Sequence, residues 1–72
     1  MEKLSEKQQA VCTFINNYIK ESGYSPSVRD ISSHFDRSVG TIYPMLKRLK
    51  QKGIIDFEEK KSRTIKIIND IS

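Results

Sequence analysis

The 72-residue sequence has few of the residues that chemistry usually requires: one cysteine, one histidine and no tryptophan. Cys12 cannot form an internal disulfide, and neither Cys12 nor His34 has partners at metal-ligand spacing. The sequence also lacks paired carboxylates, a nucleophile with a nearby base and a glycine-rich phosphate loop. We therefore predict no metal site, no cofactor, no small-molecule ligand and no enzymatic activity, and we expect Cys12 to pack and His34 to lie on the surface.

Long hydrophobic runs are also missing. The longest are two or three residues, such as Ile54-Ile55 and Ile67-Ile68, so neither a transmembrane helix nor a signal peptide is expected. The expected location is the cytoplasm. A chain of 72 residues has room for one domain, spanning 1–72, with a small core.

Charge of one sign is concentrated in the middle of the chain. Residues 1–26 hold three basic and three acidic side chains, and residues 54–72 hold four of each. Residues 27–53 hold six basic and two acidic ones, so the whole net charge of +4 lies there. Such concentration indicates a nucleic-acid contact surface, although short helical proteins also carry lysine-rich faces for solubility.

The first half of the chain predicts two helices. Ser5 and Gln8 have the spacing of a capping box, and Gly23 is placed to end the helix that follows. Apolar residues then recur at helical spacing, at Val11, Phe14, Ile15, Tyr18 and Ile19. A second, short helix is predicted after Ser27, with Asp30 as its capping-box partner. Its buried edge consists of Val28, Ile31 and Phe35.

A third helix, 39–52, follows a turn at 36–38. Ile42, Met45, Leu46 and Leu49 share one face, while the opposite face is small and uncharged at its start and cationic at its end. Ser38 is expected to cap this helix and Gly53 to end it in the Schellman manner. Because an interior proline costs about 3 kcal/mol, we expect Pro44 to delay the regular helix to about Thr41.

Two helices joined by about three residues match the helix-turn-helix, whose second helix enters the major groove of DNA. After Gly53, residues 54–57 and 63–68 are rich in β-branched side chains and enclose a charged loop, which predicts an antiparallel hairpin. The predicted fold is mainly α with a small β-hairpin, a winged helix-turn-helix of three helices and a two- or three-stranded antiparallel wing. A hairpin that only closes the core is the alternative.

The residues resemble the N-terminal DNA-binding domain of LexA repressors over nearly the whole chain. The motifs that carry this likeness are Leu4-Ser5-x-x-Gln8-Gln9, Gly23-Tyr24-Ser25-Pro26-Ser27-Val28-Arg29-Asp30-Ile31, Leu46-Lys47-x-Leu49-x-x-Lys52-Gly53-Ile54-Ile55 and Ser62-Arg63-x-Ile65. The third helix is similar instead to the recognition helix of PadR-type regulators, in which a Tyr-Pro pair such as Tyr43-Pro44 is common. The base-facing positions differ in type from those of the familiar SOS operator readers, so the same operator is not expected.

The resemblance implies a bacterial or phage regulator, associated with the nucleoid, that represses transcription from a palindromic operator. It places Ser38, Gly40, Thr41, Tyr43 and Pro44 at base-facing positions and Lys52 at a backbone-contacting one. The self-cleaving serine–lysine peptidase domain of the family, which also dimerises it, is absent from these 72 residues, so autocleavage is not predicted.

Charge and geometry add further candidates. For base contacts we favour Thr41, Tyr43, Lys47 and Arg48, although Lys47 and Arg48 suit phosphates equally well. The candidates for phosphate contacts are Ser27, Arg29, Arg37, Lys52, Lys60, Lys61 and Arg63. A homodimer on DNA is expected from the few contacts that one copy can make. The alternative function is a winged-helix module that binds an acidic protein through the same basic surface.

Overall fold

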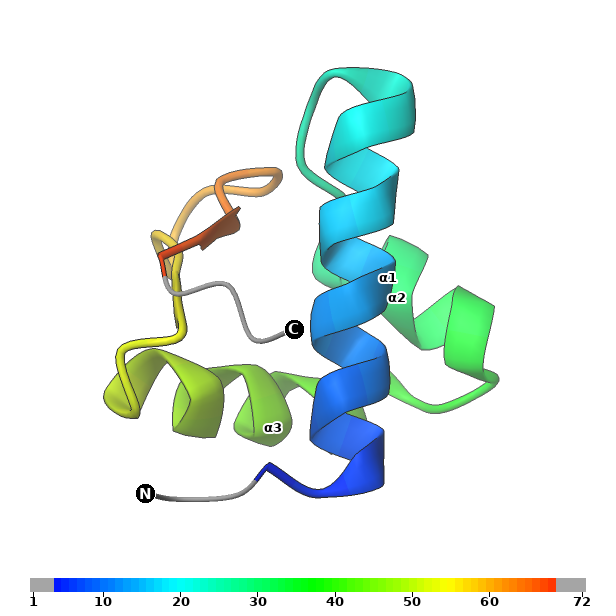
Figure 1. The fold of residues 1–72 in the computed structure, drawn as a ribbon. Helices are drawn as coiled ribbons and strands as arrows, with labels where there is room; N and C mark the ends of the chain where they lie inside the picture. The colour runs from blue at the N-terminus through cyan, green and yellow to red at the C-terminus, as the bar shows by residue number, and fades with distance from the viewer. Residues whose placement is uncertain (1–3, 69–72) are drawn as a thin grey trace.

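The computed structural model describes residues 4–68 and contains three helices and a two-stranded antiparallel sheet in that range. Helix α1 spans Glu6–Ser22, α2 spans Val28–Phe35 and α3 spans Val39–Gln51. The strands are β1 (Ile55–Asp56) and β2 (Lys66–Ile67). Figure 1 shows α1 upright, α2 packed behind it and α3 lying crosswise below the hairpin. The hairpin contacts both α1, through β2, and α3, through β1.

Local capping defines α1 as predicted. The Ser5 hydroxyl accepts from the Gln8 amide at 3.1 Å, and the Gln8 side chain accepts from the Ser5 amide at 3.1 Å. These bonds satisfy two amides that a helix start leaves unpaired. At the other end Gly23 takes the left-handed conformation, with φ +79°, and donates to the Ile19 carbonyl at 2.8 Å. The predicted capping box and glycine stop are therefore confirmed.

The second helix and the turn after it also follow the sequence signals. Ser27 and Asp30 form the reciprocal capping box, with both bonds at 3.0 Å. Asp36 ends α2 in the left-handed conformation, with φ +54°, and the Arg37 amide donates to the Ser32 carbonyl at 2.9 Å. This short turn brings α3 across α2, which is the predicted helix-turn-helix corner.

The predicted delayed start of α3 is wrong. The helix begins at Val39, because the amides of Thr41 and Ile42 both donate to the Ser38 carbonyl, at 3.0 and 3.1 Å. Pro44 therefore lies inside the helix, beyond the first turn, where its missing N–H leaves the Gly40 carbonyl without its helical donor. Burial explains why the helix tolerates this cost, since three of its apolar residues are 2% exposed or less: Ile42, Leu46 and Leu49. Ser38 is the N-cap, yet its hydroxyl contacts the Thr41 hydroxyl at 3.0 Å instead of capping an amide.

The end of α3 and the hairpin close the core. Gly53, with φ +76°, donates to the Lys50 carbonyl at 3.0 Å, and the Ile54 amide donates to the Leu49 carbonyl at 3.1 Å. These two bonds make the predicted Schellman motif. In the hairpin Ile55 pairs with Ile67 and Asp56 with Lys66. The buried apolar core draws on α1, α2, α3, β1 and the segments beside the elements: Leu4, Val11, Ile15, Ile31, Ile42, Leu46, Leu49, Ile54, Ile55, Phe57 and Ile65. The fold is the predicted winged helix-turn-helix.

Candidate nucleic-acid interface

The outer face of α3 is exposed, as the helical pattern predicts. Thr41, Pro44 and Lys47 are exposed while the residues of the opposite face pack into the core. Gly40 and Arg48 are exposed on the same side. An added Cβ at Gly40 would meet only the Ser38 hydroxyl oxygen, at 3.8 Å, so this part of the helix has open space in front of it. The face is narrow and free of large side chains at its start, which allows close approach of another surface.

Tyr43 occupies a position between the core and the outer face. Its ring is half-buried and meets the Phe57 ring edge-on, with the centroids 6.0 Å apart. The Lys47 ammonium lies 5.8 Å from the centroid of the Tyr43 ring. Tyr43 therefore links α3 to the wing and still presents part of its surface outward.

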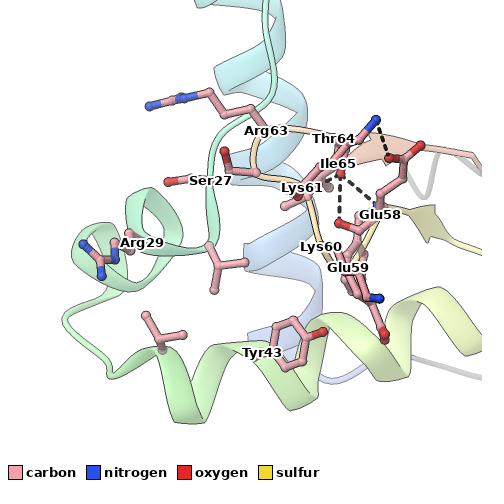
Figure 2. A pocket seen from close by; sticks show the side chains of 14 residues that line it. Ser27, Arg29, Tyr43, Glu58, Glu59, Lys60, Lys61, Arg63, Thr64 and Ile65 are labelled. Atoms are coloured by element: carbon pink, nitrogen blue, oxygen red, sulfur yellow. Dashed lines mark hydrogen bonds and ion pairs between the residues drawn. The ribbon is translucent and has the colours of Figure 1, made fainter.

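A groove of about 470 Å³ lies beside this face, between the start of α2, α3 and the wing loop. Figure 2 shows Ser27 and Arg29 on one side of it, Lys60 and Lys61 on the other, and Tyr43 at its α3 edge. Five of the seven predicted phosphate contacts line this groove and come from elements distant in sequence: Ser27, Arg29, Lys60, Lys61 and Arg63. Two others lie outside the lining of this groove, Arg37 after α2 and Lys52 at the C-cap of α3.

The cations around the groove are not all equally available. Lys47 pairs with Glu59 at 3.6 Å and Lys61 with Glu58 at 3.6 Å, both across exposed side chains. Within residues 4–68 no ion pair involves the side chains of Arg29, Arg37, Arg48 and Lys60. A polyanion would meet these unpaired cations without competition from an ion-paired carboxylate among the described residues. Near Lys47 and Lys61, the wing carboxylates Glu59 and Glu58 lower the positive electrostatic potential.

Arg63, also a candidate phosphate contact, bonds to the helical body. Its Nη1 lies 3.0 Å from the Asp30 carboxylate, and it donates to the Tyr18 hydroxyl at 3.4 Å and the Ser25 carbonyl at 3.3 Å. Figure 2 shows its side chain extending away from Lys60 and Lys61. The geometry makes Arg63 a contact between the wing and the helical body. This contact has no signature in the local sequence, because the partners of Arg63 are 33 to 45 residues away and one of them is a backbone carbonyl.

Hydrogen bonding stabilises the charged forms of this contact. The Ser27 amide, followed by the Ser27 hydroxyl and the nearby Arg63 charge, lowers the pKa of Asp30 below its ordinary value of 3.8. The hydrogen bond to Tyr18 and the Asp30 charge raise the pKa of Arg63. Carboxylate and guanidinium therefore remain charged together at neutral pH.

An exposed reading face on the second helix of a helix-turn-helix, with a flanking wing and unpaired cations, has the geometry of a DNA-binding domain. The sequence model of the family described as "LexA DNA binding domain" matches residues 1–64. The chain belongs to the LexA DNA-binding domain family.

Three relatives illustrate how far the LexA likeness extends. The LexA repressor of Thermosipho melanesiensis is 46% identical over 68 residues, which cover 94% of this chain and 34% of the repressor. The LexA repressor of Acetivibrio thermocellus is 38% identical over 69 residues, with 94% and 32% covered. That of Brevibacillus brevis is 39% identical over 71 residues, with 97% and 34% covered. The chain thus spans about a third of the length of these LexA repressors.

The groove is also lined by residues that were not among the predicted contacts. Val28 and Val39 contribute apolar surface to it, and Glu58 and Glu59 contribute carboxylates. The acidic pair is visible in the charge run of the wing loop, but its ion pairs with Lys61 and Lys47 depend on how the loop folds over α3. Among the described residues, no helix is long and apolar enough to cross a bilayer, and no group of three His, Cys, Asp or Glu side chains is placed to hold a metal ion.

Proposed function

We propose that this domain binds double-stranded DNA in a sequence-specific manner and is the DNA-reading part of a transcriptional repressor. The observation that carries the proposal is the outward face of α3, where Thr41, Pro44, Lys47 and Arg48 are exposed while Ile42, Leu46 and Leu49 on the opposite face are buried. An α-helix of about 10–12 Å diameter fits a major groove about 12 Å wide. The names of the LexA repressors support the role in repression.

In this proposal the wing and the start of α2 supply affinity. Ser27, Arg29, Lys60 and Lys61 border one groove, so a phosphate strand lying along it meets cations from both sides. Arg37 and Lys52 extend the phosphate contacts beyond the groove. Neutralising phosphates releases counterions, and this contribution to binding falls as salt rises.

Sequence preference comes from α3. Ser38, Gly40, Thr41, Tyr43 and Pro44 face the base edges, as the LexA likeness implies, and the PadR-like Tyr-Pro pair offers apolar contact to a thymine methyl group. Lys47 and Arg48 reach guanine or the adjoining phosphates. Thr41 offers a polar side chain and Lys47 a cation. Substitution at either position should change the DNA sequence that the domain prefers.

Two copies on a palindromic site would supply operator-grade affinity. Half-site centres one helical turn apart are about 34 Å from each other, and the domain measures 30 × 25 × 22 Å. This spacing exceeds each of the three dimensions of the domain, which supports two domains side by side on one face of the duplex. A chromosomal target places the proposed site of action in the bacterial cytoplasm, at the nucleoid.

The test is an unbiased duplex selection at near-physiological salt, followed by fluorescence anisotropy with the selected and a scrambled duplex. The selected duplex should contain two inverted half-sites and bind far more tightly than the scrambled one. Equal binding of both duplexes would refute sequence-specific regulation, and the domain would then be a basic module for acidic partners.

Matched variants separate the two contributions. T41A and K47Q should change the rank order of duplexes, with a loss of about 1–3 kcal/mol at the base that each contacts. K60Q should weaken all duplexes alike and reduce the salt slope by about one unit. K66Q removes the same charge from exposed Lys66, outside the groove, and should leave binding nearly unchanged.

A further inference from the structure

Arg63 has an unusual backbone as well as an unusual side-chain position. With φ +57°, it is one of two non-glycine residues with positive φ among residues 4–68. A bulky side chain in this conformation persists where its surroundings hold it. The other residue, Asp36, ends a helix, where such a conformation is common. Arg63 lies instead in the wing loop, and from this conformation its side chain makes several specific contacts.

These contacts join three separate segments. The guanidinium lies 3.0 Å from Asp30 in α2, 3.4 Å from the Tyr18 hydroxyl in α1 and 3.3 Å from the Ser25 carbonyl between these helices. It also lies over the Tyr24 ring, 5.1 Å from the centroid. A planar guanidinium can make several directed hydrogen bonds and stack at once, which a lysine ammonium cannot reproduce.

Both ends of this network are tied to the residues that begin α2. The Asp30 oxygen that meets Arg63 also accepts from the Ser27 amide at 3.0 Å and the Tyr18 hydroxyl at 3.3 Å. Two residues after Arg63, the Ile65 amide donates to the buried Ser25 hydroxyl at 3.0 Å. The part of the wing that leads into β2 is thus bound to the segment 25–30 at two points, Arg63 and Ile65.

We propose that Arg63 is a positioning residue that fixes the wing against the start of α2 and so sets the spacing across the groove. Ser27 and Arg29 lie on the α2 side of that groove, and Lys60 and Lys61 on the wing side. The inference rests on the proposed DNA-binding function. It assigns Arg63 an effect on DNA affinity that does not pass through a phosphate contact.

The salt dependence of DNA binding tests this assignment. R63Q should weaken binding to the selected duplex by about fivefold. This is at the lower end of the range of coupling energies measured for residues in contact, because the Arg63 side chain is partly exposed. The salt slope of R63Q should stay close to that of the wild type, whereas K60Q should lower its slope by about one unit. R63K keeps the charge but loses the planar guanidinium with its several directed donors, so its DNA affinity should be as low as that of R63Q. A lower slope in R63Q together with normal binding by R63K would show a phosphate contact and overturn the proposal.

A double-mutant cycle provides a second test. Asn at position 30 can still accept the Ser27 amide, so D30N removes the charge that holds Arg63 while leaving a capping bond available. In the D30N background R63Q should cost little further affinity for DNA, because the Arg63–Asp30 contact that anchors the wing is already broken. An equal loss from R63Q in both backgrounds would contradict the coupling.

Amide hydrogen exchange without DNA separates this inference from the proposed function. In R63Q the amides of Ser27 and Ile65 should exchange faster than in the wild type, while the buried amides of α3 should be unchanged. If the wild type bound no duplex but this exchange pattern held, the proposed function would fail and the anchor would stand. If folded R63Q matched the wild type in both exchange and DNA binding, the anchor itself would be refuted.

Discussion

Replacing Pro44 by alanine should stabilise the domain. Pro44 lies in the interior of α3, is exposed, and leaves the Gly40 carbonyl without its helical donor. Proline costs about 3 kcal/mol relative to alanine at such a position. Proline also restricts the unfolded chain, which returns about 0.4–1 kcal/mol of that cost. P44A should therefore raise the free energy of unfolding by about 2 kcal/mol.

This gain is large for a domain of this size. Globular proteins have stabilities of about 0.05–0.15 kcal/mol per residue, which gives about 4–11 kcal/mol for a chain of this length. A gain of 2 kcal/mol should raise Tm by about 10 °C. Urea and thermal unfolding followed by circular dichroism measure both quantities, and an unchanged m-value would show that the same surface is exposed on unfolding.

The matched control is G40A in the same turn. The added methyl group would meet only the Ser38 hydroxyl oxygen at 3.8 Å, an ordinary contact, and Gly40 does not have positive φ. G40A should therefore stabilise by about 0.5–1 kcal/mol, less than P44A. If P44A were no more stable than the wild type, Pro44 would not be interrupting the helix as described. We also expect P44A to change duplex preference, since both positions belong to the proposed reading face.

Three further predictions follow from single contacts. E59Q should strengthen DNA binding by about two- to fivefold in anisotropy titrations, because it frees Lys47 from an ion pair with Glu59. An exposed ion pair of this kind contributes a free energy that corresponds to about such a factor. Weaker binding by E59Q would contradict this prediction. The lowered pKa of Asp30 means that the native state holds fewer protons than the unfolded chain below its ordinary pKa of 3.8. The free energy of unfolding should therefore fall as pH drops through and below 3.8, and D30N should lack this component in urea titrations across that range; parallel profiles would argue against it. Burial raises the pKa of the Cys12 thiol, so its reaction with a disulfide reagent at pH 8 should be slow in buffer and fast in urea, and equal rates would show an accessible thiol.

The parts of the fold that the sequence predicted correctly depend on short-range chemistry. The capping boxes at Ser5 and Ser27 and the glycine stops at Gly23 and Gly53 each involve residues within five positions of one another. Their hydrogen-bonding groups and spacing are visible in the sequence itself. The hairpin was also predictable, because β-branched runs flank a loop without apolar residues.

The sequence-based predictions were wrong or incomplete where distant residues decide the outcome. A local cost was assigned to Pro44, but the burial of Leu46 and Leu49 against the rest of the core holds the helix together around it. Arg63 was predicted only as a candidate phosphate contact, and its bonds to α1, α2 and the segment between them could not be foreseen. Long-range placement of this kind has no signature in local spacing or charge.

The way the wing loop is closed has a consequence for how this fold can diversify. The two strands have two residues each, and beyond them the Thr64 hydroxyl accepts from the Glu58 amide at 2.8 Å. The Thr64 side chain thus bridges the base of the loop, and among residues 4–68 the strand pairing does not extend to its tip. Insertions or exchanges between positions 59 and 62 should leave this bridge and the core intact. Changes in the length or charge of the tip should therefore alter what the wing contacts without altering the helical framework that presents α3.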